Sequence, residues 1–422
     1  MDKLIIEGGT PIHGKVQVSG AKNAALPILL SAILTDQECL FSNVPDLADI
    51  TTTIKLIREL GFSAEQNGHQ VSVCAKEPKS IRASYDLVRT MRASILVLGP
   101  LLARFGKAEV SLPGGCAIGA RPVNLHLTAL EQMGAQIELT SGYVHASAKK
   151  LKGAEIHFPI VSVGATENTM MAATLAEGTT VLKNAAREPE IVDLANFLKT
   201  MGADIQGEGT SEIRIQGVPK LQGGKHSIIP DRIEAGTFLV AALISNGSVE
   251  LPGVSSYLVG ATLEKLREAG AEISETPTSI QLRSVKEIQP FDLETHPFPG
   301  FATDMQAQFM SLACVANGTS NITESIFENR FMHVAELRRL GAEIEITGNQ
   351  AKIIGHPLSS QQSLTGATVM ATDLRASASL VLAGLAARGT TTLRRIYHLD
   401  RGYERMEEKL STVGAKIRRE HE

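Results

Sequence analysis

The chain has 422 residues, which is long for one hydrophobic core and comfortable for two domains of about 200 residues each. Its 41 basic and 45 acidic residues give a formal charge of -4 without any run of five like charges, which argues against a general nucleic-acid-binding or membrane-binding surface. The absence of Trp and an aromatic content of 4% also leave little for base stacking.

Targeting and metal-binding patterns are absent from the sequence. Residues 1–7 lack the apolar core of a signal peptide, and no apolar run approaches the ~18 residues of a membrane helix. We therefore expect a soluble, cytosolic protein that binds neither membrane nor nucleic acid. No Cys-x-x-Cys or His-Glu-x-x-His spacing occurs, so we expect no disulfide framework, no metal and no cofactor; the cysteines are Cys39, Cys74, Cys116 and Cys314.

A helix that ends at a glycine before a short strand recurs six times. The glycines are spaced 73, 68, 68, 71 and 73 residues apart, and they are Gly61, Gly134, Gly202, Gly270, Gly341 and Gly414. Because glycine readily adopts the left-handed conformation that closes a helix, we interpret them as helix ends with a purely structural role. Strands such as residues 135–139 and 342–346 are expected to follow.

Each amphipathic helix is preceded by an Ala/Leu-rich helix and a strand, which gives a unit of about 70 residues. The apolar helices are expected inside each domain with the sheets packed around them. Six units divide as three and three, and a Gly-rich stretch and Pro230 place the boundary near residue 229. The sequence thus predicts an α/β protein with one domain at 22–229 and another at 1–21 and 230–422. Strands at residues 4–7 and 15–19 are expected to complete the sheet of the last unit.

Charged residues recur at the start of the apolar helices. Counting back 14 residues from the marker that closes each helix reaches Lys22, Arg92, Gly164, Asp304 and Arg375, and in the fourth unit Asp231 and Arg232 lie just before the counted position. Helix N-termini carry unpaired N–H groups and the positive end of the helix dipole, so anions are favoured there.

A second set of polar residues lies 10 to 12 residues after the same markers, in the loops before the amphipathic helices. It comprises Cys116, Glu188, Glu328 with Arg330, and Asp400 with Arg401. If the units superpose, both sets lie at the same end of every unit. We therefore expect a shared, charged cleft between the two domains.

The loop at residues 111–121 reads Ser-Leu-Pro-Gly-Gly-Cys-Ala-Ile-Gly-Ala-Arg and presents a thiol beside a guanidinium group. A nearby cation favours the thiolate of Cys116, although a lone cysteine is more often a small buried apolar residue. The neighbouring glycines predict a loop that closes after the first substrate binds.

The many cations of these two sets indicate polyanionic substrates, because guanidinium groups suit phosphate and carboxylate. Neither a P-loop nor a dinucleotide-binding motif occurs, so the residues favour a metal-free transfer between phosphorylated substrates.

The motifs at residues 19–26, 112–122, 301–308, 327–333, 371–379 and 396–405 resemble those of the enolpyruvyl transferases that act on UDP-N-acetylglucosamine. The resemblance covers the whole chain. It implies an inside-out α/β barrel fold, with two domains of three repeats each. It also implies transfer of the enolpyruvyl group of phosphoenolpyruvate to the 3′-hydroxyl of UDP-N-acetylglucosamine with release of phosphate, the first committed step of peptidoglycan precursor synthesis.

The resemblance also assigns roles to residues. Cys116 would be the general acid and could form an adduct with phosphoenolpyruvate, Asp304 would be the base, and Lys22, Arg121 and Arg401 would hold phosphoenolpyruvate. Arg330 and Arg375 are placed in the binding site and, with Asp231 and Asp373, are expected to order it. The nucleotide sugar is expected at Asn23, Arg92, Arg121, Pro122, Val123, Asn124, Leu125, Ser162, Val163, Gly164, Asp304 and Ile326.

Two departures from the family pattern and two alternatives remain. Ile160 stands where relatives often carry a basic residue, and Asn124 stands where many carry Asp, so side-chain contacts to the nucleotide are in doubt at both positions. The alternatives are a shikimate-type enolpyruvyl transferase and a non-catalytic nucleotide-sugar sensor. The sequence leaves open whether the chain forms a weak homo-oligomer.

Overall fold

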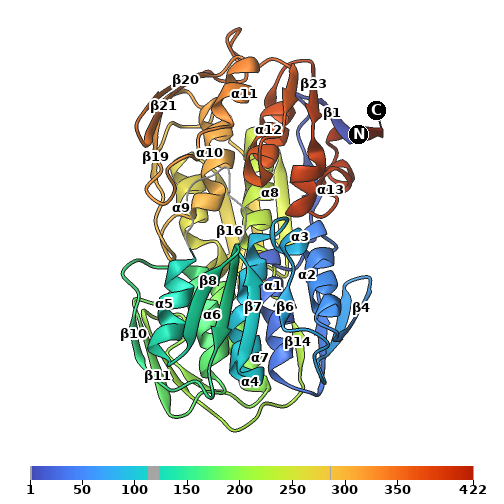
Figure 1. Ribbon diagram of the computed structural model, residues 1–422. Helices are drawn as coiled ribbons and strands as arrows, with labels where there is room; N and C mark the ends of the chain where they lie inside the picture. Colours follow the sequence, from blue (N-terminus) through green and yellow to red (C-terminus); the bar gives the residue numbers. More distant parts are fainter. Residues whose placement is uncertain (1, 113–122, 286, 422) are drawn as a thin grey trace. The chain divides into compact units, whose positions relative to one another are not determined.

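The computed structural model describes residues 2–112, 123–285 and 287–421, and these form two compact units (Figure 1). The central unit contains residues 20–112 and 123–229. The terminal unit contains residues 2–19, 230–285 and 287–421. Each unit has its own hydrophobic core, one built from side chains between Ala21 and Ile228 and the other from Leu4–Val18 and Ile233–Ile417. Each unit therefore buries its own apolar surface.

Among the described residues, six helical segments are almost fully buried, as their apolar sequences predict. In α12 every side chain from Arg375 to Ala386 is buried, as expected for a helix that is apolar on all sides. The segments are α1 (Lys22–Ser31), η2 with α4 (Arg92–Val97, Leu98–Phe105), α6 (Val163–Ala173), α8 (Arg232–Ile244), η4 with α10 (Thr303–Met305, Gln306–Ala313) and α12 (Leu374–Ala386).

A second set of helices is amphipathic. In α9, Leu263 and Leu266 are buried while Glu264 and Glu268 are exposed, which confirms the predicted pattern. The glycine after each of these helices has a φ between 91° and 100°, which confirms that it ends the helix. The set comprises α2 (Ala48–Glu59), α5 (Asn124–Gln132), α7 (Pro189–Thr200), α9 (Gly260–Glu268), α11 (Val334–Arg339) and α13 (Met406–Thr412).

The strands of the central unit form three four-stranded sheets. Listed in spatial order, they are β14 (Lys225–Ser227), β3 (Glu38–Ser42), β5 (Gln70–Cys74) and β4 (Ser63–Asn67); β6 (Arg82–Ala83), β7 (Lys107–Ser111), β9 (Tyr143–Ser147) and β8 (Gln136–Thr140); and β10 (Glu155–His157), β11 (Thr179–Lys183), β13 (Glu212–Gln216) and β12 (Asp204–Gln206).

The terminal unit has three sheets of the same size. Listed in spatial order, they are β16 (Glu272–Thr276), β17 (Ser279–Arg283), β15 (Ser248–Pro252) and β2 (His13–Lys15); β18 (Asp292–Glu294), β19 (Gly318–Thr323), β21 (Gln350–Gly355) and β20 (Glu343–Thr347); and β22 (Thr368–Met370), β23 (Thr390–Arg394), β1 (Asp2–Glu7) and β24 (Lys416–His421).

All six sheets share one topology. A short strand lies parallel to the strand that follows a buried helix, and that strand is antiparallel to a third strand, which is antiparallel to the fourth, as in β10, β11, β13 and β12. In five sheets the third and fourth strands form a hairpin, and in the last sheet they are β1 and β24. This arrangement confirms an α/β fold with a six-fold internal repeat.

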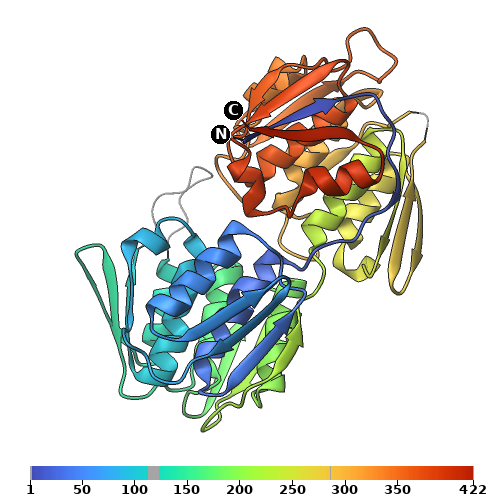
Figure 2. The same ribbon diagram turned by 90° about the vertical axis from the view of Figure 1, so that its right-hand side faces the viewer.

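The first strand of the chain completes the last sheet, as predicted. Leu4 of β1 pairs with Leu393 of β23 on one side and with Arg419 of β24 on the other. In Figure 2 the blue β1 lies among red strands of the same sheet.

The second half of the predicted leading strand, residues 15–19, is a wrong prediction. The strand there is β2, which ends at Lys15 and lies parallel to β15 in another sheet. The chain leaves the last sheet at Gly8, where a Cβ atom would lie 2.0 Å from the carbonyl oxygen of Ala387. After Gly8 the chain continues into the sheet of β16, β17, β15 and β2.

None of the helices in the described part of the chain is long and apolar enough to cross a lipid bilayer.

Candidate active site

Three of the predicted site residues meet in the terminal unit. The Oδ1 of Asp304, in η4, accepts a hydrogen bond from Arg330 Nη2 at 2.6 Å, and its Oδ2 accepts one from Arg375 Nη2 at 2.9 Å. The two arginine side chains are 6% and 7% exposed, whereas that of Asp304 is 28% exposed. We call this group the Asp304 clamp. Its carboxylate is held from two sides and still reaches solvent.

The charges of the clamp stabilise one another. Burial would raise the pKa of Asp304, but the positive charges of Arg375 and Arg330 outweigh burial and hold that pKa well below its usual range. Burial would likewise lower the pKa of Arg375, yet Asp304 raises it. The carboxylate of Asp304 therefore stays ionised at neutral pH between two guanidinium groups.

Two other acids predicted to order the site cap helices. Asp373 accepts hydrogen bonds from the N–H groups of Arg375 and Ala376 at 2.8 and 3.0 Å, and so begins α12. Asp231 does the same for the first turn of α8. Because Arg375 lies in the first turn of α12, the cap holds the backbone that carries this member of the clamp.

Arg401 ends η5 (Ile396–Arg401) and is half-buried. The preceding residue, Asp400, accepts two hydrogen bonds from Arg419 of β24, at 2.6 and 3.1 Å. Arg419 also donates to Glu407 at 2.6 Å. The last strand therefore fixes the segment that carries Arg401.

In the central unit, Lys22 is the first residue of α1 and is buried. Its Nζ lies 3.1 Å from Oδ2 of Asp49, which is in the first turn of α2 and is buried as well. Asp49 was not among the predicted site residues, because an acid in the first turn of a helix is common and carries no functional signal. The carboxylate of Asp49 therefore compensates the positive charge of Lys22, which is buried at the N-terminus of α1.

The predicted nucleotide-sugar residues of the central unit begin three helices. Arg92 starts η2, Ser162 caps α6 by accepting from Ala165 N–H at 3.3 Å, and Val123 precedes α5. Asn23 is the second residue of α1 and is half-buried, and Ile160 is 66% exposed. Helix N-termini are therefore present at the positions where the sequence predicts that anionic groups of the ligand bind.

His126, in the first turn of α5, was missed by the sequence analysis. Its ring carbon Cε1 and Nε2 lie 3.2 and 3.4 Å from the position that a Cβ would take at Gly164. Only glycine therefore leaves this ring its full space. The one available signal was its place directly after the predicted stretch 121–125.

The hydrogen bonds of Asn168 determine the tautomer of His126. Asn168 Oδ1 accepts from Gly99 N–H at 2.8 Å, so its Nδ2 is the atom that faces His126 Nδ1 at 3.1 Å. Nδ1 must therefore accept, which leaves the proton on Nε2 beside Gly164. Burial and the positive charge of Arg92 lower the pKa of His126 to about 4, so the ring is a neutral donor at physiological pH.

Glu188, predicted at the repeat position of Cys116, lies immediately before α7 and is buried near Glu167 and Glu190. Burial, with the charges of Glu190 and Glu188, raises the pKa of Glu167 well above its usual range. Glu167 therefore holds its proton more firmly than an exposed glutamate does, and no motif in the sequence pointed to it.

Cys116, Arg121 and Pro122 lie outside the described residues, as does the predicted closing loop. Asn124 and Leu125 are the first two residues of α5, and Ile326 lies between β19 and α11. Within the described ranges, no group of three or more His, Cys, Asp or Glu side chains is arranged to hold a metal ion.

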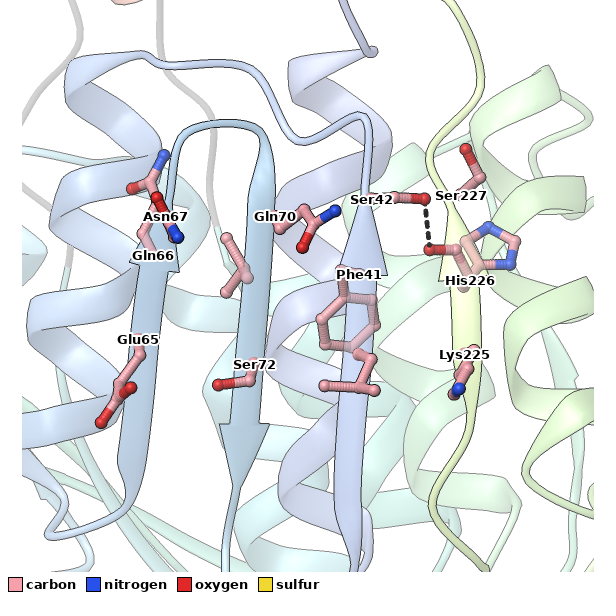
Figure 3. A pocket seen from close by; sticks show the side chains of 12 residues that line it. Phe41, Ser42, Glu65, Gln66, Asn67, Gln70, Ser72, Lys225, His226 and Ser227 are labelled. Atoms are coloured by element: carbon pink, nitrogen blue, oxygen red, sulfur yellow. Dashed lines mark hydrogen bonds between the residues drawn. The ribbon is translucent and has the colours of Figure 1, made fainter.

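The sheet of β14, β3, β5 and β4 bears a shallow hollow of about 550 Å³ (Figure 3). It is lined by exposed polar residues such as Glu65, Gln70 and Lys225, and the hydroxyl of Ser42 donates to the carbonyl oxygen of His226 at 3.4 Å. None of the 12 lining residues is a predicted site residue. We therefore do not place the chemistry there.

Comparison with known proteins identifies the family. The family model described as EPSP synthase (3-phosphoshikimate 1-carboxyvinyltransferase) matches residues 6–410. Proteins named UDP-N-acetylglucosamine 1-carboxyvinyltransferase are 60% identical in Nitratidesulfovibrio vulgaris and 56% identical in Geotalea daltonii, each over 100% of both chains. A third, from Pseudoalteromonas atlantica, is 57% identical over 99% of this chain and 100% of its own.

Solved structures agree. The enolpyruvyl transferase NikO from Streptomyces tendae superposes with a TM-score of 0.87 at 25% identity, over 99% of this chain and 98% of its own. An EPSP synthase from Acinetobacter baumannii superposes with a TM-score of 0.78 at 21% identity over 100% of both chains, which shows the shared fold. The resemblance found in the motifs is thus confirmed, and the chain belongs to the enolpyruvyl transferases and, within them, to the UDP-N-acetylglucosamine 1-carboxyvinyltransferases.

Proposed function

We propose that this chain transfers the enolpyruvyl group of phosphoenolpyruvate to the 3′-hydroxyl of UDP-N-acetylglucosamine and releases phosphate, as the first committed step of peptidoglycan precursor synthesis. The observation that carries this proposal is the 60% identity over the full length to a protein named for that transfer. We further propose that the reaction takes place in the cytosol, as expected from the sequence.

The reaction is an addition followed by an elimination. The sugar oxygen bonds to C2 of phosphoenolpyruvate while its proton passes to a base, and an acid protonates C3 to form a methyl group. The tetrahedral ketal then loses phosphate from C2 and a proton from C3, which restores the double bond. We assign the acid to Cys116 and the base to Asp304. The thiol of Cys116 can also add across the C2=C3 double bond, so that sulfur bonds to C2, the π bond breaks and a proton passes to C3, which gives a covalent adduct.

The Asp304 clamp supports the assignment of Asp304. Its carboxylate is ionised, partly exposed and fixed in direction by Arg330 and Arg375. A carboxylate with a depressed pKa is a weak base toward an alcohol. It accepts the proton once bonding to C2 has made the hydroxyl strongly acidic, so orientation matters more here than basicity.

Lys22, Arg121 and Arg401 hold the phosphate and carboxylate of phosphoenolpyruvate and stabilise the ketal. Two described contacts support this role. Asp49 fixes the ammonium group of Lys22 at the start of α1, and the Asp400–Arg419 pair fixes the segment of Arg401. The ammonium group of Lys22 and the segment that carries Arg401 are thus held in place before a ligand arrives.

The nucleotide sugar binds at Asn23, Arg92, residues 121–125, residues 162–164, Asp304 and Ile326. The N-terminus of α6 supports a phosphate contact, since its first N–H groups point outward from the cap at Ser162. The neutral Nε2–H of His126, next to Gly164, adds a donor at the same helix end. Such donors compensate in part for the missing basic side chain at Ile160.

The finer description of the fold is also a proposal. Three buried helices enclosed by three sheets in each unit support the inside-out α/β barrel. Domains at 22–229 and at 1–21 with 230–422 are supported by the two separate cores, except that Ala21 packs in the core of the central unit.

A phosphate-release assay with phosphoenolpyruvate tests the function. We expect phosphate release with UDP-N-acetylglucosamine and none above background with shikimate 3-phosphate. The reverse result would favour the shikimate-type alternative. Binding of UDP-N-acetylglucosamine without any release would favour the sensor.

Replacing the thiol tests the role of Cys116. Cys116→Ser should lower turnover by about 10²-fold or more, because a hydroxyl is a far weaker acid, while binding of the nucleotide sugar persists. An epoxide that mimics phosphoenolpyruvate should alkylate the thiol, as seen by mass spectrometry of the loop peptide. Equal activity of variant and wild type would remove Cys116 from the mechanism.

A further inference from the structure

Glu324, directly after β19, is a buried carboxylate that the proposed reaction does not use. Four groups donate hydrogen bonds to it. Oε1 accepts from Thr295 Oγ1 at 3.0 Å, from Ile326 N–H at 2.9 Å and from Phe327 N–H at 3.1 Å. Oε2 accepts from Thr303 Oγ1 at 2.8 Å. Both oxygens therefore act as acceptors, on opposite sides of the carboxylate.

The contact with Thr303 leads to the Asp304 clamp. Arg330 Nη1 lies 2.8 Å from Thr303 Oγ1, and a guanidinium group can only donate. The hydroxyl of Thr303 therefore accepts from Arg330 and must give its own proton to Glu324. The direction of every hydrogen bond from Arg330 through Thr303 to Glu324 is thus determined.

The other side of Glu324 orders the chain next to the same arginine. Its bonds to two backbone N–H groups hold Ile326 and Phe327, and the ring centroid of Phe327 lies 5.1 Å from the Cζ of Arg330. One buried carboxylate therefore fixes both the hydroxyl that holds Nη1 of Arg330 and the segment that packs against its guanidinium group.

We propose that Glu324 is a positioning residue that sets Arg330, and through it the carboxylate of Asp304, and also the backbone of Ile326. The proposal rests on the proposed function, in which Asp304 accepts the proton of the sugar hydroxyl and Ile326 contacts the sugar. Glu324 itself touches neither substrate. Its role is to keep two parts of the binding site in register.

The chemistry requires a carboxylate at this position. An amide has a single acceptor oxygen, so in Glu324→Gln it can accept either from Thr303 or from the Ile326–Phe327 backbone. If it faces the backbone, the amide N–H turns toward Thr303, whose hydroxyl then has to accept and loses the acceptor for its own proton; if it faces Thr303, the amide N–H opposes two backbone N–H donors. The substitution keeps the size of the side chain and fails in the one property that the proposal needs.

Steady-state kinetics test this prediction. Glu324→Gln should lower kcat about 10-fold to 100-fold, because a misplaced catalytic carboxylate costs rate even over small distances. Glu336→Gln is the matched control. Glu336 lies in α11 of the same unit and accepts from Met370 N–H at 2.9 Å, without contact to the clamp. We expect its kcat to stay within about threefold of wild type.

Thr303 allows a second test that does not remove a buried charge. Thr303→Val should lower kcat and shift the acid limb of the pH profile of kcat to higher pH. Arg330 then holds Asp304 less firmly, so the pKa of Asp304 is depressed less. Thr303→Ser restores the hydroxyl and should recover kcat to within about threefold. Equal kcat in the two glutamine variants, or equal loss in the valine and serine variants, would overturn the proposal.

Amide hydrogen exchange separates this inference from the proposed function, since it needs no turnover. In Glu324→Ala, exchange at Ile326 and Phe327 should become at least about tenfold faster while most of the terminal unit keeps its protection. Unchanged exchange at these two amides would contradict the positioning role. Absence of phosphate release by the wild type would contradict the proposed function alone.

Discussion

At the scale of single residues, Asp304 combines two opposing demands. The two arginines that keep its carboxylate ionised also weaken it as a base. The same contacts, at 2.6 and 2.9 Å, leave it little freedom to turn away from a bound hydroxyl. The carboxylate of Asp304 is therefore a weaker base with a fixed orientation. Substitutions that change its orientation should lower activity as much as those that remove its charge.

Asp304→Asn should lower kcat by about 10²-fold to 10⁴-fold, because it removes the proton acceptor that we propose. It should also cost about 3 kcal/mol of unfolding free energy at pH 7, since two buried guanidinium groups lose their partner. Phosphate release and urea denaturation measure the two effects.

The stability effect of Asp304→Asn should depend on pH. The folded-state pKa of Asp304 lies below the value near 3.9 of an unfolded aspartate, so its stabilisation is present above about pH 4 and is lost as the pH falls further. Asp292→Asn is the control, because Asp292 is an exposed acceptor on β18 of the same unit. An equal loss of stability in both variants would contradict a special role for the clamp.

His126 should make the protein sensitive to mild acid. Its pKa is lowered to about 4, whereas an unfolded histidine titrates near 6.5, so only the unfolded state binds a proton between these values. The wild type should therefore lose about 2 kcal/mol more unfolding free energy between pH 7.5 and pH 5 than His126→Asn does.

Urea denaturation at the two pH values measures this difference. His157→Asn is the control, because His157 is exposed on β10 of the same unit. If the unfolding free energy of His126→Asn depends on pH as that of the wild type does, the conclusion that the buried His126 ring is neutral is wrong.

At the scale of helices and strands, the sequence predicted the repeat well because its signals are local. Glycines such as Gly202 and Gly341 end helices whatever the rest of the chain does, and apolar helices such as α12 must be buried. The partner of β2 was mispredicted because strand pairing depends on distant residues. Nothing near Lys15 indicates that it lies beside Glu250.

The same difference explains which residues of the candidate site could be predicted. Asp304 and Arg375 were found because they occupy equivalent positions in the repeat. Asp49, His126 and Glu324 act through contacts with Lys22, Gly164 and Thr303 that span tens of residues in sequence or depend on side-chain direction. Those contacts exist only once helices and strands are packed.

Arg419→Ala should loosen the segment that carries Arg401. It removes the two bonds to Asp400 and the one to Glu407, so we expect the KM for phosphoenolpyruvate to rise about threefold to tenfold. Because the Arg419 side chain is 31% exposed, 0.5 M salt should reduce the difference from wild type.

Arg418→Ala is the matched control, since Arg418 is the neighbouring residue on the same strand and pairs with Glu7 and Glu420 at the surface. Its KM should stay within about twofold of wild type. An equal rise in both variants would show that general charge, and not the anchoring of η5, is responsible.

At the scale of the whole molecule, two hydrophobic cores share one chain. Phe197 is buried in the core of the central unit, and Phe309 in that of the terminal unit, where it packs edge-on against Phe301 with ring centroids 4.9 Å apart. A cavity in one core should therefore lower the local stability mainly of that unit.

Phe309→Ala should cost about 3–5 kcal/mol and accelerate amide exchange in residues 230–421, with little change in residues 20–229. Phe197→Ala should give the opposite pattern. Hydrogen exchange with mass spectrometry distinguishes them, and faster exchange throughout the chain in both variants would mean that the two cores unfold together.

The position of β1 has a consequence for biosynthesis. Residues 2–7 are translated long before both strands that flank them, β23 and β24, which lie at residues 390–421. At typical elongation rates a nascent chain carries this apolar segment unpaired for roughly 20 to 80 s. A deletion of residues 2–7 thus removes the middle strand of a late-forming sheet, whereas a ribosome-bound intermediate can already have completed the sheets of the central unit.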